Sequence, residues 1–150
     1  MAEGGAVAFD TSAILAALLG WHEHHARAWP VLEAALTGGG RVVIPLPALV
    51  EAYSVMTRLP PGQRLRGDDA LAVLSATFEG TAEVVAIEGA EGWAVLRSAL
   101  ARAGSGGATY DAHIVACARK AGVRTLVTFN ERHFARLDLG PIKLQVPAPA

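Results

Sequence analysis

The sequence has little of three features that would point to particular classes of protein: cysteine, net charge and long apolar runs. Its only cysteine, Cys117, cannot form an internal disulfide, which favours a reducing compartment. A net charge of -1 excludes whole-molecule attraction to nucleic acid or to an anionic membrane. No apolar stretch approaches the ~18 residues of a membrane span, and the N-terminus lacks the basic region of a signal peptide. We therefore expect a cytoplasmic protein without a membrane anchor.

The composition that remains is that of a folded globular domain. Apolar residues make up 52% of the 150 residues and charged residues 18%, which excludes the disordered and collagen-like classes. The length matches about one domain. We predict a single domain over residues 1–146, followed by a short disordered tail at 147–150.

Short apolar segments suited to buried strands alternate with segments of helical spacing. The predicted strands are residues 6–9, 41–44, 83–87 and 125–128, with a candidate fifth at 142–145. The predicted helices are residues 13–19, 22–36, 46–59, 68–78, 90–103 and 109–121. This alternation predicts a three-layer α/β/α domain with a central parallel sheet of four to five strands. Ligands of such sheets bind outside the carboxyl ends of the strands, so chemistry is expected there.

Asp10 stands at such a position, directly after the first predicted strand. An aspartate before a helix can simply accept the free amide hydrogens of the first turn, and this alone would explain it. Ser12 can cap the same helix, however, and Asp10 would then be free to face the crevice. Both interpretations of Asp10 are compatible with the sequence.

Two further acids lie on predicted helices. Residues 46–59 carry apolar side chains on every face, as a buried helix does. Glu51 lies in this helix, the most apolar of the chain, and is predicted to face the core, the alternative being a surface contact with Arg58 or Ser54. Asp111 shares the apolar stripe of its helix with Ile114. Its alternative is a first-turn acid that the helix dipole favours by at most ~1 kcal/mol.

The three acids come from different elements, and each is predicted to face inward near a strand end or a helix start. Converging carboxylates raise one another's pKa and destabilise the fold unless a cation lies between them. The sequence places no cationic side chain between these acids, so a hard divalent metal is the expected counter-ion. Mg²⁺ takes oxygen ligands, and a carboxylate-bound ion can activate water and neutralise a phosphodiester transition state.

Four sequence blocks in register resemble the PIN-domain ribonucleases, and within them the VapC-type toxins of toxin–antitoxin pairs. The blocks span nearly the whole chain: Phe9-Asp10-Thr11-Ser12-Ala13-Ile14-Leu15, Pro47-Ala48-Leu49-Val50-Glu51-Ala52-Tyr53-Ser54-Val55, Gly106-Gly107-Ala108-Thr109-Tyr110-Asp111-Ala112-His113-Ile114-Val115-Ala116 and Leu126-Val127-Thr128-Phe129-Asn130-Glu131-Arg132-His133-Phe134. The resemblance implies a PIN-like fold and a metal-dependent endoribonuclease, the toxin of such a pair.

The resemblance also implies roles for individual residues. Asp10 and Asp111 match the acids that hold Mg²⁺ or Mn²⁺ in the family, and Glu51 matches the third acid. Asn130 falls where many members have a fourth acid, but an asparagine brings no charge. Three hydroxyls are expected to support the site: Thr11 and Ser12 would orient the first acid, and Thr128 would act similarly at the fourth strand.

Expected partners follow from the same resemblance. RNA is the substrate, and Arg58, Arg132 and His133 are candidates for contacts with its sugar-phosphate backbone, although solvated surface charge would explain each of them singly. The resemblance implies a cognate VapB-type antitoxin whose C-terminal tail wraps the helices within residues 13–36 and 46–59. It also implies a homodimer, for which Trp93 is a candidate contact if it does not belong to the core.

Other functions are less compatible with these residues. A haloacid-dehalogenase-type phosphatase needs a second acid at position 12, a response-regulator receiver needs an adjacent acid pair, and a dinucleotide-binding domain needs a glycine fingerprint after the first strand. A housekeeping RNA-processing nuclease without an antitoxin, and a PIN-like binding module that has lost catalysis, remain as alternatives. His22, His24 and His25 are too closely spaced to converge on one metal ion, so a rim or packing role is expected.

Overall fold

Five parallel strands form the centre of the molecule in a computed structural model that describes residues 5–102, 104 and 106–149. The strands are β1 (Val7–Phe9), β2 (Val42–Pro45), β3 (Glu83–Val85), β4 (Thr125–Val127) and β5 (Lys143–Gln145). They are ordered β3-β2-β1-β4-β5, and every neighbouring pair is parallel. The predicted parallel sheet is confirmed, and it includes the fifth strand.

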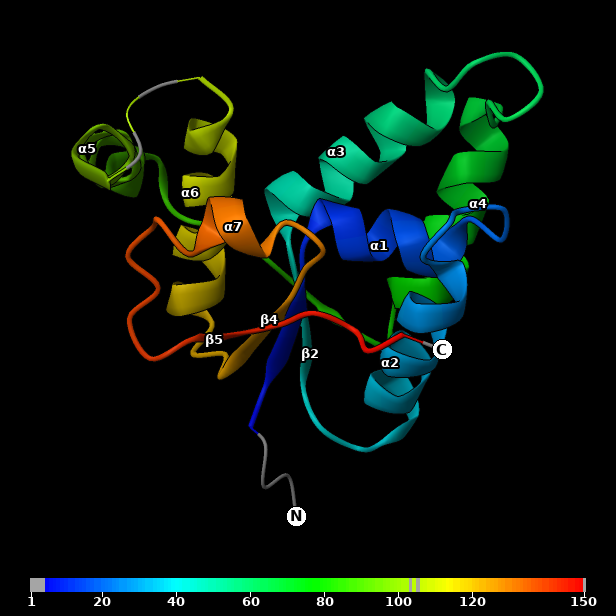
Figure 1. Ribbon diagram of the computed structural model, residues 1–150, viewed down its shortest axis with the longest axis horizontal. Helices are drawn as coiled ribbons and strands as arrows, with labels where there is room; N and C mark the ends of the chain where they lie inside the picture. Colours follow the sequence, from blue (N-terminus) through cyan, green and yellow to red (C-terminus); the bar gives the residue numbers. More distant parts are fainter. Residues whose placement is uncertain (1–4, 103, 105, 150) are drawn as a thin grey trace.

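Helices cover both faces of this sheet. They are α1 (Thr11–Leu18), α2 (His25–Thr37), α3 (Leu46–Thr57), α4 (Gly67–Phe78), α5 (Gly92–Arg102), α6 (Ala108–Lys120) and α7 (Glu131–Phe134), with a 3-10 turn η1 (Gly89–Glu91). Helices α1 to α4 gather on one side, and α5, α6 and α7 on the other (Figure 1). The three-layer α/β/α arrangement is therefore confirmed. Residue 103, where the predicted helix 90–103 ends, lies outside the described residues.

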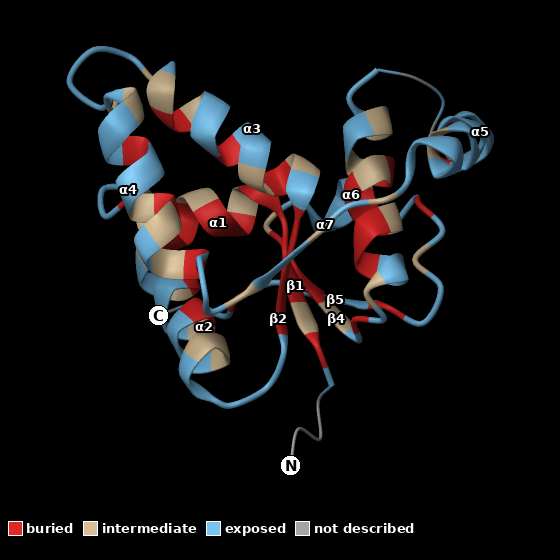
Figure 2. Cartoon of the chain, turned by 180° about the vertical axis from the view of Figure 1, so that it is seen from behind, coloured by how far each residue is buried: buried red, intermediate tan, exposed pale blue. Residues whose placement is uncertain are grey.

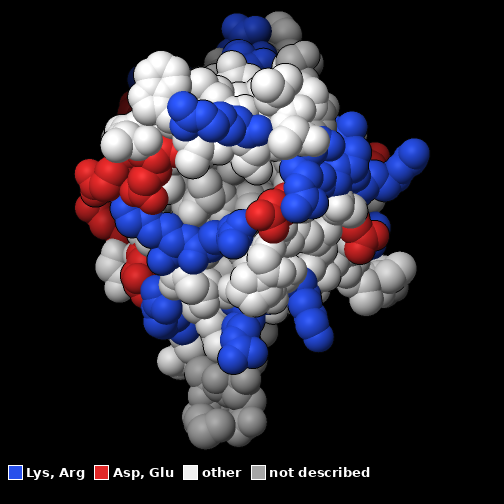
Figure 3. Space-filling model, turned by 90° about the vertical axis from the view of Figure 1, so that its left-hand side faces the viewer, with Lys and Arg blue, Asp and Glu red and all other residues white. Residues whose placement is uncertain are grey.

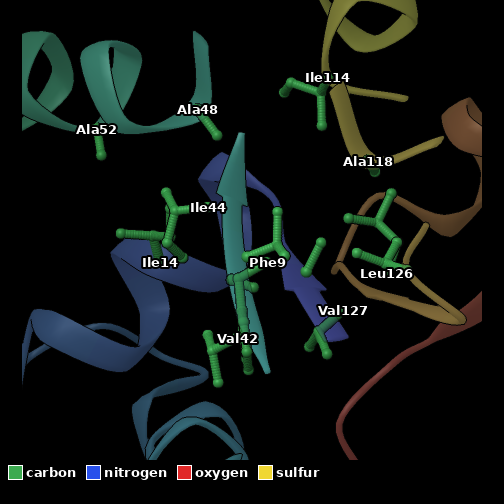
Figure 4. Close-up of a cluster of buried hydrophobic side chains, with 14 of the residues drawn as sticks. Phe9, Ile14, Val42, Ile44, Ala48, Ala52, Ile114, Ala118, Leu126 and Val127 are labelled. Carbon is green, nitrogen blue, oxygen red and sulfur yellow. The ribbon is translucent and has the colours of Figure 1, made fainter. Parts of the chain in front are cut away.

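The core lies between the strands and the two helical layers. Ala8, Val43, Ile44 and Leu126 on the three central strands are fully buried, which explains why these strands are apolar without alternation. Figure 4 shows the side chains of Ala48 and Ala52 on one side of the strands, and those of Ile114 and Ala118 on the other. Buried residues follow the inner faces of α1, α3 and α6 and the central strands (Figure 2).

Helix α3 does not have the environment that its sequence predicts. Only one line of its residues is buried, with Ala48, Ala52 and Met56 inside, while Val50 and Tyr53 are exposed. The expectation of a helix buried on every side is wrong, because one face of α3 is open along the described part of the chain.

Helix α5 also leaves one apolar face exposed. Val95 and Ala99 face the core, whereas Trp93, Leu96 and Leu100 form an exposed apolar stripe, with Trp93 64% exposed. Trp93 is therefore no core residue. Within the described ranges, no helix has the length and apolar character needed to cross a membrane.

The register of the central strands brings two loops together. Phe9 of β1 pairs with Val127 of β4, and the backbone N–H of Asp10 donates to the carbonyl of Val127 at 3.1 Å. Parallel strands end at the same edge, so Asp10 and Thr128 lie side by side although 118 residues separate them. This edge positions the site.

Candidate active site

Asp10 is both a helix cap and the centre of a hydrogen-bond network. Its Oδ1 accepts from the backbone N–H of Ala13 at 2.8 Å and from the hydroxyl of Ser12 at 2.7 Å, while its Oδ2 accepts from the hydroxyl of Thr128 at 2.6 Å. Of the two interpretations that the sequence left open, the structure shows the cap: Asp10 itself is the N-cap of α1. Ser12 instead accepts a hydrogen bond from the N–H of Phe129 at 2.9 Å. Ser12 and Thr128 therefore both hold Asp10 by a hydrogen bond, and their supporting role in a metal site stays a prediction.

The environment of Asp10 disfavours its charged form. The side chain is 1% exposed, and burial raises its pKa from 3.8 to about 6, although the three hydrogen bonds oppose this by favouring the carboxylate. The charge of Asp111 raises the pKa further. Among the described residues, the buried polar side chains are Asp10, Thr11 and Thr128, and all three lie at this edge of the sheet.

Glu51 reaches the site from the rim of α3. It is exposed, so the expectation that it faces the core is wrong. It precedes the buried Ala52 and is therefore turned by about 100° from the core-facing line. The hydroxyl of Thr11 donates to Oε1 of Glu51 at 2.6 Å. Thr11 was expected to orient Asp10, but it holds Glu51 instead.

Asp111 lies on the first turns of α6 and is half-buried. Burial raises its pKa, and the nearby charge of Glu51 acts in the same direction, whereas the charges of His133 and Arg136 lower it. These two basic side chains belong to α7 and to the turn after it, so their charges act on Asp111 from that side of the site.

The carboxylates of this site suit a hard divalent ion that keeps several of its own water ligands. No group of three or more His, Cys, Asp or Glu side chains in the described part of the chain is arranged to hold a metal ion. An ionised carboxylate offers about four lone-pair directions, and three hydrogen bonds occupy three of those of Asp10. One direction remains for a metal. Mg²⁺ typically takes one or two carboxylates and keeps several waters, so Asp10 with Asp111 fits such an ion.

The other residues predicted for the site are all exposed, and they are Arg58, Asn130, Arg132 and His133. Asn130 is exposed at the start of α7; its side chain does not cap the helix, and its backbone N–H donates to the hydroxyl of Thr128 at 2.8 Å. Arg132 and His133 are exposed on α7.

Arg58 lines a cleft of about 460 Å³ together with Glu51. This cleft separates α3 from α6, and Tyr110 and His113 line its α6 side. No role was predicted for these two residues from the sequence.

Comparison with known proteins agrees with this arrangement. The family model of the PIN domain matches residues 7–139. Ribonuclease VapC40 of Mycobacterium tuberculosis is 36% identical over 122 residues, which cover 80% of this chain and 84% of the relative. The chain belongs to the PIN-domain family, among its VapC-type ribonucleases.

Solved structures show the same fold. The sarcin-ricin-loop-cleaving toxin VapC20 of M. tuberculosis superposes with a TM-score of 0.70 at 16% identity, covering 89% of this chain and 98% of that one. VapBC2 of Rickettsia felis, bound to a DNA fragment from its promoter, gives 0.68 at 17% identity and covers 95% and 99%. FitAcB of Neisseria gonorrhoeae gives 0.62 at 19% identity and covers 92% and 95%.

Proposed function

We propose that this chain is a metal-dependent endoribonuclease that acts in the cytoplasm as the toxin of a toxin–antitoxin pair. One observation carries the proposal. A buried aspartate, Asp10, is fixed by three hydrogen bonds at the end of the central strand β1, and the charge of Asp111 reaches it. Burying a carboxylate and then placing another beside it costs stability. A bound cation would offset that cost.

Each acid has a distinct part in this proposal. Asp10 and Asp111 would hold Mg²⁺ or Mn²⁺, and the ion supplies an activated water and neutralises charge on the phosphodiester. Ser12, Thr128 and the N–H of Ala13 keep Asp10 in one orientation. Glu51 is exposed and held by Thr11, so its carboxylate can orient a water at the mouth of the site.

RNA would enter through the cleft between α3 and α6. Arg58 lies in this cleft and its Nε donates to Ser54 at 3.2 Å, which holds the guanidinium beside the path of a phosphate backbone. Arg132 and His133 on α7 would contact the backbone from the other side. Lysine and arginine side chains form a band across the face shown in Figure 3, so the chain offers local positive charge despite its net charge of -1.

Two apolar surfaces support the proposed protein partners. An open groove of about 520 Å³ between α3 and α4, lined by Leu49, Val50, Tyr53 and Leu71 among others, suits the apolar part of a cognate VapB-type antitoxin. The Trp93 stripe of α5 suits a second copy of the chain in a homodimer. The structural neighbours VapBC2, bound to a DNA fragment from its promoter, and FitAcB support the proposal of a cognate antitoxin.

The test is RNA cleavage by the purified chain. We expect cleavage of single-stranded RNA with Mg²⁺ or Mn²⁺, none with EDTA, and a loss of at least about 100-fold in Asp10→Asn and in Asp111→Asn. Asp68→Asn, which changes an exposed aspartate on α4, is the matched control and should cleave normally. Full activity in Asp10→Asn would refute the assigned site, and an inactive wild-type chain that binds RNA would favour a PIN-like binding module.

A further inference from the structure

Phe129 follows Thr128 in the loop after β4, and two side chains from the start of α2 contact its ring. The imidazole of His24 stacks on it, with ring centroids 4.6 Å apart and an angle of 9° between the planes. The guanidinium carbon of Arg27 lies 5.2 Å from the ring centroid, a distance at which a cation is attracted to the π face. We call these three residues, His24, Arg27 and Phe129, the Phe129 clamp.

The backbone of Phe129 belongs to the hydrogen-bond network of Asp10. Its N–H donates to the Oγ of Ser12 at 2.9 Å, and Ser12 in turn donates to Oδ1 of Asp10 at 2.7 Å. A serine hydroxyl has one hydrogen to give. Because the N–H of Phe129 fills an acceptor position of Ser12, it directs the hydroxyl hydrogen of Ser12 toward Asp10.

The clamp is itself anchored at the C-terminal end of the chain. Nε and Nη2 of Arg27 both donate to the carbonyl of Pro147, at 3.0 and 2.6 Å. Pro147 is buried, although it lies inside the predicted tail 147–150, whose disorder stays a prediction. These two bonds fix one edge of the Arg27 guanidinium, formed by Nε and Nη2, to a single carbonyl oxygen and so restrict its movement away from the ring of Phe129.

We propose that Phe129 is a positioning residue of the nuclease, which fixes Ser12 and through it the orientation of Asp10. The inference rests on the proposed function, and it assigns a role to a ring whose contacts are with His24 and Arg27. A displaced Phe129 backbone leaves Ser12 free to rotate its hydroxyl away. Removing an orienting partner of a metal-binding side chain typically reduces metal affinity or activity 10- to 100-fold.

The first variant is Phe129→Leu, which stays apolar but loses both ring contacts. Phe129→Tyr, which keeps the ring, is the conservative rescue. Phe78→Leu is the matched control, because Phe78 is buried on α4 and is not among the residues that hydrogen-bond to Asp10 or Ser12. We expect Phe129→Leu to bind Mn²⁺ about 10-fold more weakly by calorimetry and to lose kcat with little change in KM. Phe129→Tyr should restore both quantities. Phe78→Leu should lower the melting temperature but keep the metal affinity and kcat of the wild type.

A second readout needs neither metal nor RNA. In the metal-free chain, the amide of residue 129 should be protected from hydrogen exchange in the wild type and in Phe129→Tyr, and exchange at least about 10-fold faster in Phe129→Leu. Unchanged protection at residue 129 in the leucine variant overturns the proposal, whether or not the chain cleaves RNA. Equal losses of kcat in Phe129→Leu and Phe78→Leu would also overturn it, because they would reduce the role of Phe129 to packing. An inactive wild type with the expected exchange pattern would contradict only the nuclease function.

Discussion

Thr11 and Glu51 lie 40 residues apart, and the hydroxyl of Thr11 donates to the Glu51 carboxylate at 2.6 Å. Thr11 begins α1 directly after Asp10, and Glu51 lies on α3. The contact therefore ties the third acid to the element that carries the first. It also explains why an exposed glutamate can have a defined orientation, since the buried Thr11 cannot follow it into solvent.

Thr11→Val should reduce activity more than stability. Valine keeps the shape of threonine but cannot hydrogen-bond to Glu51, and the exposed carboxylate is then solvated by water instead. We expect about 1 kcal/mol less unfolding free energy and a kcat about 10-fold lower. Thr77→Val is the matched control, because Thr77 is part-buried and donates only within α4, to the carbonyl of Val73 at 2.7 Å. Urea unfolding and RNA-cleavage assays measure the two effects, and equal kcat in both variants would separate Thr11 from the function of Glu51.

Asp10 should make the metal-free protein more stable at acidic pH. Its pKa is raised by burial to about 6 from 3.8, so the folded state binds more protons than the unfolded state between these values. The unfolding free energy from this group therefore rises as the pH falls through this window, by roughly 3 kcal/mol in all. Asp10→Asn keeps an N-cap oxygen but cannot titrate.

The measurement is urea unfolding of both proteins in EDTA at pH 4.5 and pH 7. We expect the unfolding free energy of the wild type to rise relative to that of Asp10→Asn when the pH is lowered from 7 to 4.5. A difference in unfolding free energy that stays the same at both pH values would contradict the raised pKa of Asp10. Other acids that the two proteins share, such as Glu83 with its lowered pKa, cancel in this comparison.

Asp111→Asn should leave the metal-free protein at least as stable as the wild type. Burial and the charge of Glu51 both raise the pKa of Asp111, so removing its charge relieves an unfavourable interaction. His133 and Arg136 act against this and limit the gain. Metal should raise the melting temperature of the wild type more than that of Asp111→Asn. A metal-free variant that melts well below the wild type would indicate that Asp111 serves only as a favourable charge on the first turn of its helix.

Much of the fold was predictable because its three central strands, β1, β2 and β4, are buried on both faces. Such strands contain few polar residues, and the segments around Ala8, Ile44 and Leu126 were identified on that basis. Helix α7 was not predicted, because four residues cannot show a helical period. The influence of the His133 and Arg136 charges on Asp111 could not be predicted either, because it depends on where this short helix and the turn after it are placed.

The site was predictable as a set of residues but not as a set of contacts. Asp10 was identified because it follows a buried strand, a position that chain order alone reveals. The partner of Thr11 could not be predicted, because a hydrogen bond between residues 40 positions apart depends on how α1 packs against α3. Glu51 was misplaced for a related reason. The apolar residues Val50 and Tyr53 led to the prediction that α3 is fully buried, whereas they form an open surface beside Glu51.

The open surface that Val50 and Tyr53 form is where we expect the antitoxin to bind. Val50 and Tyr53 line the groove between α3 and α4, and Val50 also lines the cleft that contains Glu51. A segment bound along the groove could thus continue into the cleft and place a basic side chain among the acids. Coupled folding of such a segment costs ordering entropy, so apolar burial and the charged contact are both needed for tight binding.

Two variants test the nuclease site and the groove separately in cells. Expression of the chain alone should arrest growth, co-expression with a cognate antitoxin should relieve the arrest, and Asp10→Ala should abolish it. Leu71→Asp puts a charge into the groove at a residue that is 61% exposed, so the fold should tolerate it. This variant should stay toxic but escape relief, because it still cleaves RNA while the antitoxin binds at least about 10-fold more weakly. Relief equal to that of the wild type would place the antitoxin elsewhere, and harmless expression of an RNA-cleaving wild type would indicate a housekeeping nuclease.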